Sequence, residues 1–564
     1  MQLNGARILI ECLIREGVNI IFGYPGGSVL DIYDELPQYG EQLRHVLVRH
    51  EQAAVHAADG YARATGKVGV CMATSGPGAT NTVTGIATAY CDSIPMVIFT
   101  GQVPTGLIGN DAFQEVDIAG ITRPCTKHNY VVKDVKDLAK VVRQAFYLAR
   151  SGRPGPVLVD LPKNVLQGSA EFVWPEDVSL RSYNPTYRPN YAQIRKVVDA
   201  LYNAERPLLF GGGGVIMSNA SEEFRNLAKN LSIPVTCSLM GLGAFPCDHP
   251  QWLGMLGMHG TYAANKAVSN ADLLIAVGVR FDDRVTGRLS SFAPKATIVH
   301  IDIDPTSIHK NVNVRIPVVG DCRNSLIAIR EHLAAREPLP WKERFAAWQG
   351  QLDEWKQEQP ITWTPGETTI KPQEVIKAVD KITEGKAILT TEVGQHQMWA
   401  AQLYNFTEPR TLLTSGGLGT MGYGFPPALG AQFAYPNKLV IDVSGDGSFQ
   451  MNLQELITAV SNKLPVKVLL LNNGCLGMVR QLQDLFYGGR LNAVDIPDQP
   501  DFVKLAEAYG AEGYRVAKLE DLESTLRTAF ASPNTAIIDV IVERDENVYP
   551  TVPSGASLDE MLLL

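Results

Sequence analysis

Short runs of apolar residues alternate along this chain with segments in which apolar residues recur every three or four positions. The first pattern is typical of buried β-strands and the second of amphipathic helices. Apolar runs such as 273–279, 439–444 and 466–471 alternate with helical segments in this way. That alternation predicts βαβ units and therefore parallel sheets.

Two stretches rich in proline and polar residues interrupt the pattern, at about 166–192 and 346–372. Such composition is typical of linkers between domains. We therefore predict three doubly wound, parallel-sheet α/β domains and a C-terminal tail. Their boundaries are 1–165, 193–345, 373–545 and 546–564.

The first and third domains share a local pattern. Residues Val68–Gly101 and Leu439–Gly474 each contain an apolar strand, Ser-Gly-x-Gly, a helical segment, a proline and a second apolar strand. The prolines, Pro95 and Pro465, match with a shift of one residue. Either all βαβ units look alike, or the two domains are duplicates that have diverged in role.

Composition excludes several classes of protein. The chain has 564 residues, a net charge of −9 and no basic block, so nucleic acid is not expected as a partner. Eight scattered cysteines without a CxxC pair fit a reducing compartment better than a disulfide framework or zinc site. We see no signal peptide and no run of 18 apolar residues, and we expect a cytoplasmic protein without a membrane span.

The third domain carries the strongest chemical pattern. The run 439–444 ends in Gly445-Asp446-Gly447-Ser448, a helix follows from about Asn452, and the next apolar run ends in Asn472-Asn473. Ligands of doubly wound sheets bind at the carboxyl ends of strands, where helix N-termini favour phosphate. Asp446 would repel that phosphate unless Mg²⁺ lay between them. If the two strands are neighbours, Asp446 and the amide oxygen of Asn473 converge on one point.

This pairing resembles the diphosphate–metal motif of thiamine-diphosphate enzymes. The resemblance implies that Asp446, Asn473 and the backbone carbonyl of Cys475 bind the metal, and that the first and third domains are the thiamine-diphosphate-binding domains. It also implies a second diphosphate loop at Val393-Gly394-Gln395-His396. Further residues implied to contact this cofactor are Pro25, Gly26, Glu51, Gly419, Met421, Gly445, Gly447, Ser448, Gly477 and Met478.

Glu51 follows the predicted strand 45–48 and opens a helix. A zinc-protease HExxH motif is excluded because position 54 is alanine. A glutamate in a first helical turn often only complements the helix dipole. Within the pattern R-H-E-x-x-A, however, Glu51 resembles the catalytic glutamate that exchanges a proton with N1′ of the cofactor's aminopyrimidine. In that family the two ends of the cofactor are bound by different chains, which implies a homodimer with active sites at the subunit interface.

Met421 lies in a glycine-rich octet, 415–422. A methionine in such a loop is often a gap filler. In thiamine-diphosphate enzymes, however, an apolar residue at the matching position bends the cofactor between its two rings.

The middle domain shows a Rossmann-like pattern without a GxGxxG motif, because position 216 is isoleucine. Its first predicted strand ends in Gly211-Gly212-Gly213, and later strands lead to Arg280 and Asp302. Charged strand ends suit a ribose and a pyrophosphate, although surface salt bridges would leave the same pattern.

The whole chain resembles the large catalytic subunits of acetohydroxyacid synthases, through RFDDRVTG (280–287) and GMLGMHG (254–260) in particular. The resemblance implies FAD at Gly211, Gly212, Gly213, Arg280 and Asp302, without a net redox role. It also implies that Arg284 binds the carboxylate of the second keto acid. Phe113, Gln114, Met258 and Leu482 would line the substrate pocket. A separate regulatory small subunit is a further family expectation.

The implied enzyme is a thiamine-diphosphate-dependent transferase. It decarboxylates pyruvate on the cofactor and condenses the hydroxyethyl carbanion with pyruvate or 2-ketobutyrate. The products, 2-acetolactate and 2-aceto-2-hydroxybutyrate, lead to valine and isoleucine in branched-chain amino acid biosynthesis. The alternatives are a decarboxylase or pyruvate oxidase of the same superfamily, and a non-catalytic nucleotide-binding or scaffold protein with this fold.

The chain departs from the family at one position. Most members have tryptophan where this sequence has Leu482. That tryptophan borders the acceptor pocket, packs against the ethyl group of 2-ketobutyrate and stacks on sulfonylurea-type inhibitors. Leucine leaves room there unless Met478 or Phe486 fills the gap. We predict weak discrimination between the two acceptors, a preference for acetolactate, and resistance to those inhibitors.

Overall fold

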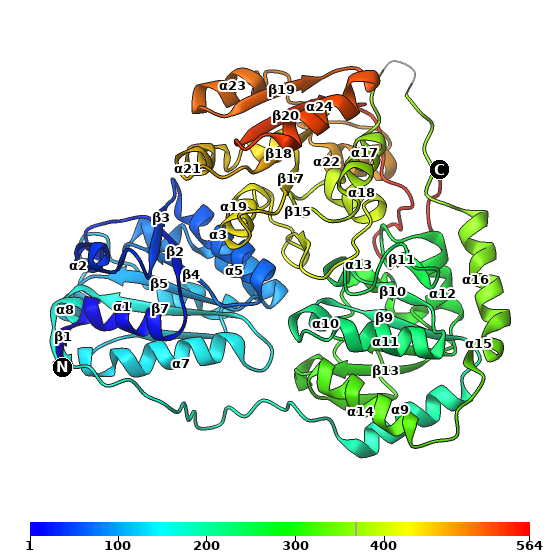
Figure 1. Ribbon diagram of the computed structural model, residues 1–564, viewed down its shortest axis with the longest axis horizontal. Helices are drawn as coiled ribbons and strands as arrows, with labels where there is room; N and C mark the ends of the chain where they lie inside the picture. Colours follow the sequence, from blue (N-terminus) through cyan, green and yellow to red (C-terminus); the bar gives the residue numbers. More distant parts are fainter. Residues whose placement is uncertain (367–368) are drawn as a thin grey trace.

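The computed structural model describes residues 1–366 and 369–564 and contains three six-stranded parallel sheets, one per domain (Figure 1). In Figure 1 the N-terminal domain lies on the left in blue and cyan, the middle domain at lower right in green, and the C-terminal domain at the top in yellow to red. This arrangement confirms the predicted fold class.

The N-terminal sheet has the order β3-β2-β4-β5-β7-β6. Its strands are β2 (Ile20–Gly23), β3 (Arg44–Leu47), β4 (Gly69–Ala73), β5 (Met96–Gln102), β6 (His128–Val131) and β7 (Pro156–Pro162). Its helices are α1 (Gly5–Arg15), α2 (Leu30–Glu35), α3 (Glu51–Thr65), α4 (Pro77–Thr80), α5 (Val83–Asp92), α6 (Ile118–Thr122), α7 (Leu138–Arg150) and α8 (Lys163–Gln167). Two short strands, β1 (Gln2–Asn4) and β8 (Ser169–Glu171), form a separate antiparallel pair.

The C-terminal sheet has the order β16-β15-β17-β18-β20-β19. Its strands are β15 (Ile388–Thr391), β16 (Leu412–Leu413), β17 (Val440–Gly445), β18 (Lys467–Asn472), β19 (Glu512–Val516) and β20 (Ala536–Ile541). Its helices are α17 (Pro372–Thr383), α18 (Gln395–Leu403), α19 (Phe425–Ala434), α20 (Asp446–Phe449), α21 (Leu456–Ser461), α22 (Gly477–Phe486), α23 (Phe502–Tyr509) and α24 (Leu519–Ala531). In chain order both outer sheets read 2-1-3-4-6-5, so the predicted relationship between the first and third domains is confirmed.

The middle sheet has the order β11-β10-β9-β12-β13-β14, which in chain order is the Rossmann order 3-2-1-4-5-6. Its strands are β9 (Pro207–Gly211), β10 (Val235–Cys237), β11 (Trp252–Met255), β12 (Leu273–Val277), β13 (Thr297–Asp302) and β14 (Ile316–Val319). Its helices are α9 (Tyr191–Asn203), α10 (Gly213–Met217), α11 (Ser221–Leu231), α12 (Tyr262–Asn270), α13 (Asp283–Thr286), α14 (Cys322–Ala334), α15 (Trp341–Arg344) and α16 (Ala346–Glu358).

The predicted linkers differ from the structure in detail. The first begins late, because β8 still pairs with β1, and residues 172–190 then cross to the middle domain as coil (Figure 1). The first half of the predicted second linker is helix α16, whose Trp348 and Leu352 are buried in a core of the middle domain. The apolar stripe of α16 is narrow, and for this reason its composition resembles that of a linker.

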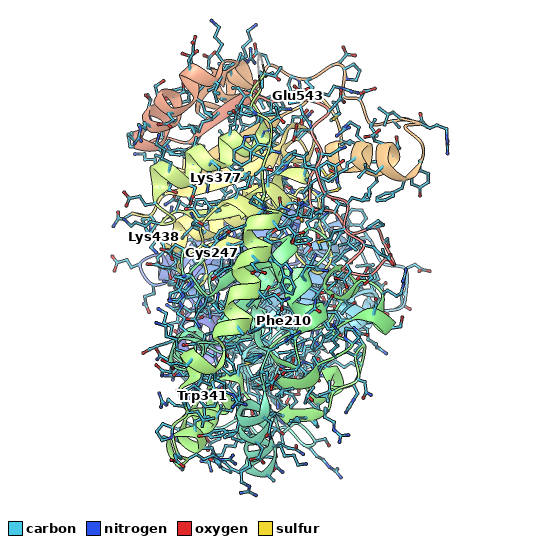
Figure 2. All side chains as sticks on the ribbon, turned by 90° about the vertical axis from the view of Figure 1, so that its right-hand side faces the viewer. Phe210, Cys247, Trp341, Lys377, Lys438 and Glu543 are labelled. Carbon is cyan, nitrogen blue, oxygen red and sulfur yellow. The ribbon has the colours of Figure 1, made fainter. Side chains whose placement is uncertain are left out.

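The C-terminal tail packs against the middle domain. Val552, Ala556 and Leu558 are buried in the same hydrophobic core as α16. Cys247, labelled in Figure 2, lies where the middle domain meets the C-terminal domain, and its N–H donates to the carbonyl of Phe406 at 3.3 Å. Both junctions join the middle and C-terminal domains.

The outer domains are held together by a close crossing of α3 and α19. A Cβ atom added at Gly430 would lie 1.9 Å from the carbonyl oxygen of Ala57, and one added at Gly60 would lie 2.3 Å from that of Pro427. These obstacles are backbone atoms, so no rotamer change can relieve them. Glycine at both positions therefore permits the contact.

We expect Gly430→Ala to lower the thermal unfolding midpoint, because overpacking at a rigid contact costs about 1–3 kcal/mol or more. Gly350→Ala is the matched control: Gly350 lies inside α16 with no heavy atom within 4 Å of the added Cβ. At that position the higher helix propensity of alanine should raise the free energy of unfolding by up to about 1 kcal/mol. Equal midpoints for the two variants, measured by calorimetry, would show that the crossing is not tight.

Candidate functional site

The first candidate site lies at the carboxyl ends of β15 and β17, which are neighbours in the C-terminal sheet. The strand order reverses direction between them, and ligands of doubly wound sheets bind at such switch points. The chain leaves β15 through Glu392, Val393 and Gly394 into α18, and it leaves β17 directly into α20. This helix starts at Asp446, earlier than the sequence indicated, and α21 follows from Leu456.

Asp446 and Asn473 converge as expected, because β17 and β18 pair in parallel. The Asp446 carboxylate accepts a hydrogen bond from the backbone N–H of Gly474 at 3.1 Å and another from Gln499. Asn473 Oδ1 accepts from the N–H of Cys475 at 3.1 Å. Burial raises the pKa of Asp446. A cation beside this carboxylate would counter that effect.

A cavity of about 100 Å³ adjoins these groups. Candidate residues that line it are Val393, Gly394, Gln395, His396, Met421, Gly445, Asp446, Gly447, Ser448, Asn473, Cys475, Gly477 and Met478. Two buried polar atoms at this cavity, Gln395 Oε1 and His396 Nε2, have no hydrogen-bond partner within the described ranges. Burial lowers the pKa of His396 to about 4, so its ring is neutral and can donate one hydrogen bond.

These features fit a diphosphate bridged by a divalent cation. Unpartnered buried polar atoms are rare and indicate a missing ligand. In the part of the chain that the structure describes, no cluster of three His, Cys, Asp or Glu side chains could hold a metal by itself. A cation at Asp446 would therefore depend on amide, carbonyl and phosphate oxygens, the donor set that Mg²⁺ accepts.

A buried carboxylate holds the loop that carries Met421. Glu392 accepts hydrogen bonds from the N–H groups of Gly422 at 2.6 Å and Phe425 at 3.4 Å. Burial, with Asp442 nearby, raises the pKa of Glu392 well above its usual range. The methyl group of Met421 lies 3.6 Å from a Cβ built at Gly447, so Met421 lines the cavity beside the turn that carries Asp446.

A second, larger cavity of about 1260 Å³ lies where all three domains meet, with most of its lining from the middle and C-terminal domains. It opens at the switch point between β9 and β12, where Gly213, Arg280 and Asp302 line it. Gly211 and Gly212 are buried beside it, and a Cβ at Gly212 would lie 2.2 Å from the carbonyl oxygen of Gly278. The volume exceeds that of most small-ligand pockets, about 300–1,000 Å³, and suits a dinucleotide.

Three of the candidate substrate residues line the same large cavity. Arg284 Nη1 lies 3.6 Å from the sulfur of Met258, and the Met258 N–H donates to the carbonyl of Arg284 at 2.7 Å. One face of α22 supplies Met478, Leu482 and Phe486. Leu482 is 41% exposed, so the residues that the structure describes do not bury its side chain. Gly419 also lies on this cavity.

The remaining candidates lie apart, at the carboxyl end of the N-terminal sheet. Glu51 Oε2 accepts from Asn81 Nδ2 at 2.9 Å, and Pro25 and Gly26 follow β2 as Val393 and Gly394 follow β15. Of the described residues that line the two cavities, none belongs to this group.

The 109–115 loop completes this separate group. A Cβ built at Gly76 would lie 2.8 Å from the carbonyl oxygen of Gln114, which places Gln114 at the same edge as Glu51. Phe113 is 88% exposed. The chain therefore presents two half-sites, one with Glu51, Phe113 and Gln114 and one with Asp446.

A buried ionic cluster that the sequence did not reveal joins the two outer domains. Arg63 of α3 contacts Asp59 at 2.5 Å and Asp92 at 2.9 Å. Tyr423 of the third domain donates to Asp59, and Asp92 accepts from the N–H of Gly417 at 2.7 Å. The only sequence signal was the i, i+4 spacing of Asp59 and Arg63, which usually indicates a surface pair.

Comparisons with known proteins agree with this architecture. Residues 3–121, 194–329 and 392–540 match the N-terminal TPP binding, central and C-terminal TPP binding domains of thiamine pyrophosphate enzymes. The chain is 51% identical to the acetolactate synthase isozyme 3 large subunit of Escherichia coli, over 100% of this chain and 99% of that one. It is 50% identical to the acetolactate synthase large subunit of Haemophilus influenzae, over 100% and 98%, and to the acetolactate synthase of Mycobacterium leprae, over 99% and 90%. Across the described ranges, no helix is both long enough and apolar enough to cross a membrane.

Proposed function

Since the chain belongs to the acetolactate synthase large-subunit family of thiamine-diphosphate enzymes, we propose that it joins pyruvate to a second 2-keto acid, pyruvate or 2-ketobutyrate. The products would be 2-acetolactate and 2-aceto-2-hydroxybutyrate, intermediates of branched-chain amino acid biosynthesis. The observation that carries this proposal is the position of Arg284, Met258 and Leu482 on one cavity. Val393, Gly394 and Met478, which also line the smaller cavity at Asp446, line it too. A guanidinium beside an apolar wall suits an acceptor with a carboxylate and a short alkyl group.

Thiamine diphosphate, when bound, would supply the carbon nucleophile that releases CO₂ from pyruvate and adds the remaining two-carbon unit to the acceptor. Asp446, Asn473 and the Cys475 carbonyl would hold Mg²⁺ against its diphosphate, with His396 as a donor to the phosphate oxygens. Met421 would keep the two rings of the cofactor bent toward each other. Glu51 would exchange a proton at N1′ of the aminopyrimidine.

The large cavity would hold FAD, with Gly211, Gly212 and Gly213 permitting close approach at the switch point. Arg280 pairs with Asp282 at 3.2 Å and Asp302 accepts from the N–H of Asp304 at 2.8 Å, so both charged strand ends are ordered. The flavin would have no net redox role in the proposed reaction.

We further propose a homodimer, because Glu51 and Asp446 lie in different half-sites of one chain. The exposed Phe113 supports this assembly, since a phenylalanine that is 88% exposed is a typical contact residue. A separate regulatory small subunit would bind in addition, as the large-subunit names of the relatives suggest. All eight cysteines are free, which favours a reducing compartment such as the cytoplasm.

Purified protein given pyruvate, thiamine diphosphate, Mg²⁺ and FAD should release CO₂ and form 2-acetolactate. Chromatography of the products measures this outcome. Acetaldehyde as the main product would instead indicate a decarboxylase, and acetyl phosphate with flavin reduction an oxidase. Full activity without any flavin would contradict the FAD assignment.

Asp446→Asn and Glu51→Gln should have different effects, because the two half-sites have different roles: one binds the cofactor and the other transfers a proton. Asp446→Asn removes the charge that holds Mg²⁺, so calorimetry should show little binding of thiamine diphosphate in Mg²⁺. Glu51→Gln should retain cofactor binding but slow exchange of the C2 proton by about 10²-fold or more, a typical contribution of general acid–base catalysis. Wild-type affinity in the first variant, or unchanged C2 exchange by NMR in the second, would contradict the respective role.

Leu482→Trp should increase the preference for 2-ketobutyrate over pyruvate by about 10-fold or more, because extra apolar contact with one methylene contributes about 1–3 kcal/mol. It should also raise sensitivity to sulfonylurea-type inhibitors. Competition between equal concentrations of the two acceptors measures the preference. Leu491→Trp is the matched control, since Leu491 is equally exposed, at 41%, and does not line the cavity. An equal change in both variants would mean that Leu482 does not set the preference.

A further inference from the structure

A third cavity, of about 360 Å³, shares no lining residue with either candidate cavity and lies where α11 of the middle domain faces Pro409 and Arg410 of the C-terminal domain. We call it the junction cavity. Its polar lining consists mainly of Asn219, Ser221, Glu222, Arg225, Lys229 and Arg410. None of these residues belongs to the proposed active site.

Arg410 connects all three domains at this cavity. Its Nη1 donates to the carbonyl of Arg63 at 3.0 Å, in the N-terminal domain. Its Nη2 donates to the carbonyl of Ile216 at 3.1 Å and to Asn219 Oδ1 at 3.0 Å, in the middle domain. Every acceptor is uncharged.

Arg225, on α11 at the opposite side of the junction cavity, also donates only to uncharged acceptors. Its Nε donates to the carbonyl of Ala244 at 2.8 Å, and its Nη2 donates to those of Gly243 at 2.7 Å and Thr407 at 3.0 Å. These bonds fix the guanidinium at the cavity but do not neutralise it.

The charge of the junction cavity is therefore uncompensated. Within the described ranges neither arginine forms an ion pair with a carboxylate; the nearby Glu408 pairs instead with Lys438, which Figure 2 labels, at 3.7 Å. Burial lowers the pKa of Arg225 and of Arg410. Three cationic side chains line the cavity against one carboxylate, the exposed Glu222. Half-buried cations without a counter-charge are unfavourable, and an anion would relieve this cost.

The first turn of α11 adds donors of a second kind. The helix begins at Ser221 without a side-chain cap, so its first N–H groups have no side-chain acceptor. Ser221 is only 8% exposed, and its hydroxyl has no partner among the described residues. A helix N-terminus, a hydroxyl and guanidinium groups together are the donors that typically bind phosphate.

We propose that the junction cavity binds the phosphate group of a small phosphate monoester. Arg225, Lys229 and Arg410 neutralise the phosphate, and the start of α11 donates hydrogen bonds to it. The cavity volume lies within the range of small-molecule sites, about 300–1,000 Å³, and leaves room for an organic part beside the phosphate. Because Arg410 contacts all three domains, the ligand stabilises their docking.

Calorimetry on the holoenzyme tests the proposal, with thiamine diphosphate, Mg²⁺ and FAD saturating so that their sites cannot take up the probe. Glycerol 3-phosphate should bind once per chain and raise the unfolding midpoint, whereas glycerol should not bind. Inorganic phosphate should bind at least several-fold more weakly than the ester. Absence of glycerol 3-phosphate binding would overturn the site, and equal affinity for inorganic phosphate would overturn the assignment of an ester.

Variants locate the binding. Lys229→Gln should weaken glycerol 3-phosphate binding by about 5-fold or more and Arg410→Lys by about 10-fold or more, since a charge-assisted hydrogen bond contributes about 1.5–3 kcal/mol. Lys196→Gln, an exposed lysine on α9 of the same domain, is the matched control and should bind like the wild type. Lys229 is itself exposed, so its replacement leaves the fold intact even if Arg410→Lys does not. Wild-type affinity in Lys229→Gln would overturn the proposal.

Discussion

The contact on which the whole architecture depends is the crossing of α3 and α19, where backbone meets backbone at Gly60 and Gly430. Each helix starts at or close to a candidate functional group: α3 begins with Glu51, and α19 begins four residues after Met421. The crossing therefore fixes the distance between these two groups within one chain. Because a close-packed interface has low compressibility, a small displacement of one helix moves the other.

The ionic cluster around Arg63 makes the same interface specific. A buried ion pair contributes little net stability, because the desolvation of both charges offsets their attraction, but removal of one partner strands the other at a cost of about 3–5 kcal/mol. Asp92 shares its carboxylate between Arg63 and the N–H groups of Gly416 and Gly417, at the start of the glycine-rich loop. An incorrect docking of the two domains would break every bond of this cluster that crosses the interface, from Gly416 and Gly417 to Asp92 and from Tyr423 to Asp59, and would leave these buried groups unpaired. The cluster thus selects one position for the Met421 loop, and Glu392 holds the loop's other end.

Features set by local rules could be predicted from the sequence. The pattern of apolar residues and the turn residues next to it locate the strand ends that carry Asp446 and Asn473. They also locate the two Ser-Gly-x-Gly turns. Features set by tertiary contacts could not. Helix α16 looked like a linker because only two of its described residues, Trp348 and Leu352, are buried. No local pattern indicated that Glu392 is fully buried, or that Arg410 bonds to residues of both other domains.

The separation of the half-sites is itself a consequence of the rigid interface. If one cofactor contacts both Glu51 and Asp446, then either the outer domains move or a second chain supplies one half. Domain movement within the chain would open the glycine crossing and break the buried hydrogen bonds from Tyr423 to Asp59 and from the N–H group of Gly417 to Asp92. A second chain requires no such change, since it only has to cover surface that is already exposed, including Phe113. Rigid docking within each chain therefore favours a shared site between two chains, and each chain's α3–α19 contact would then connect one shared site to the other.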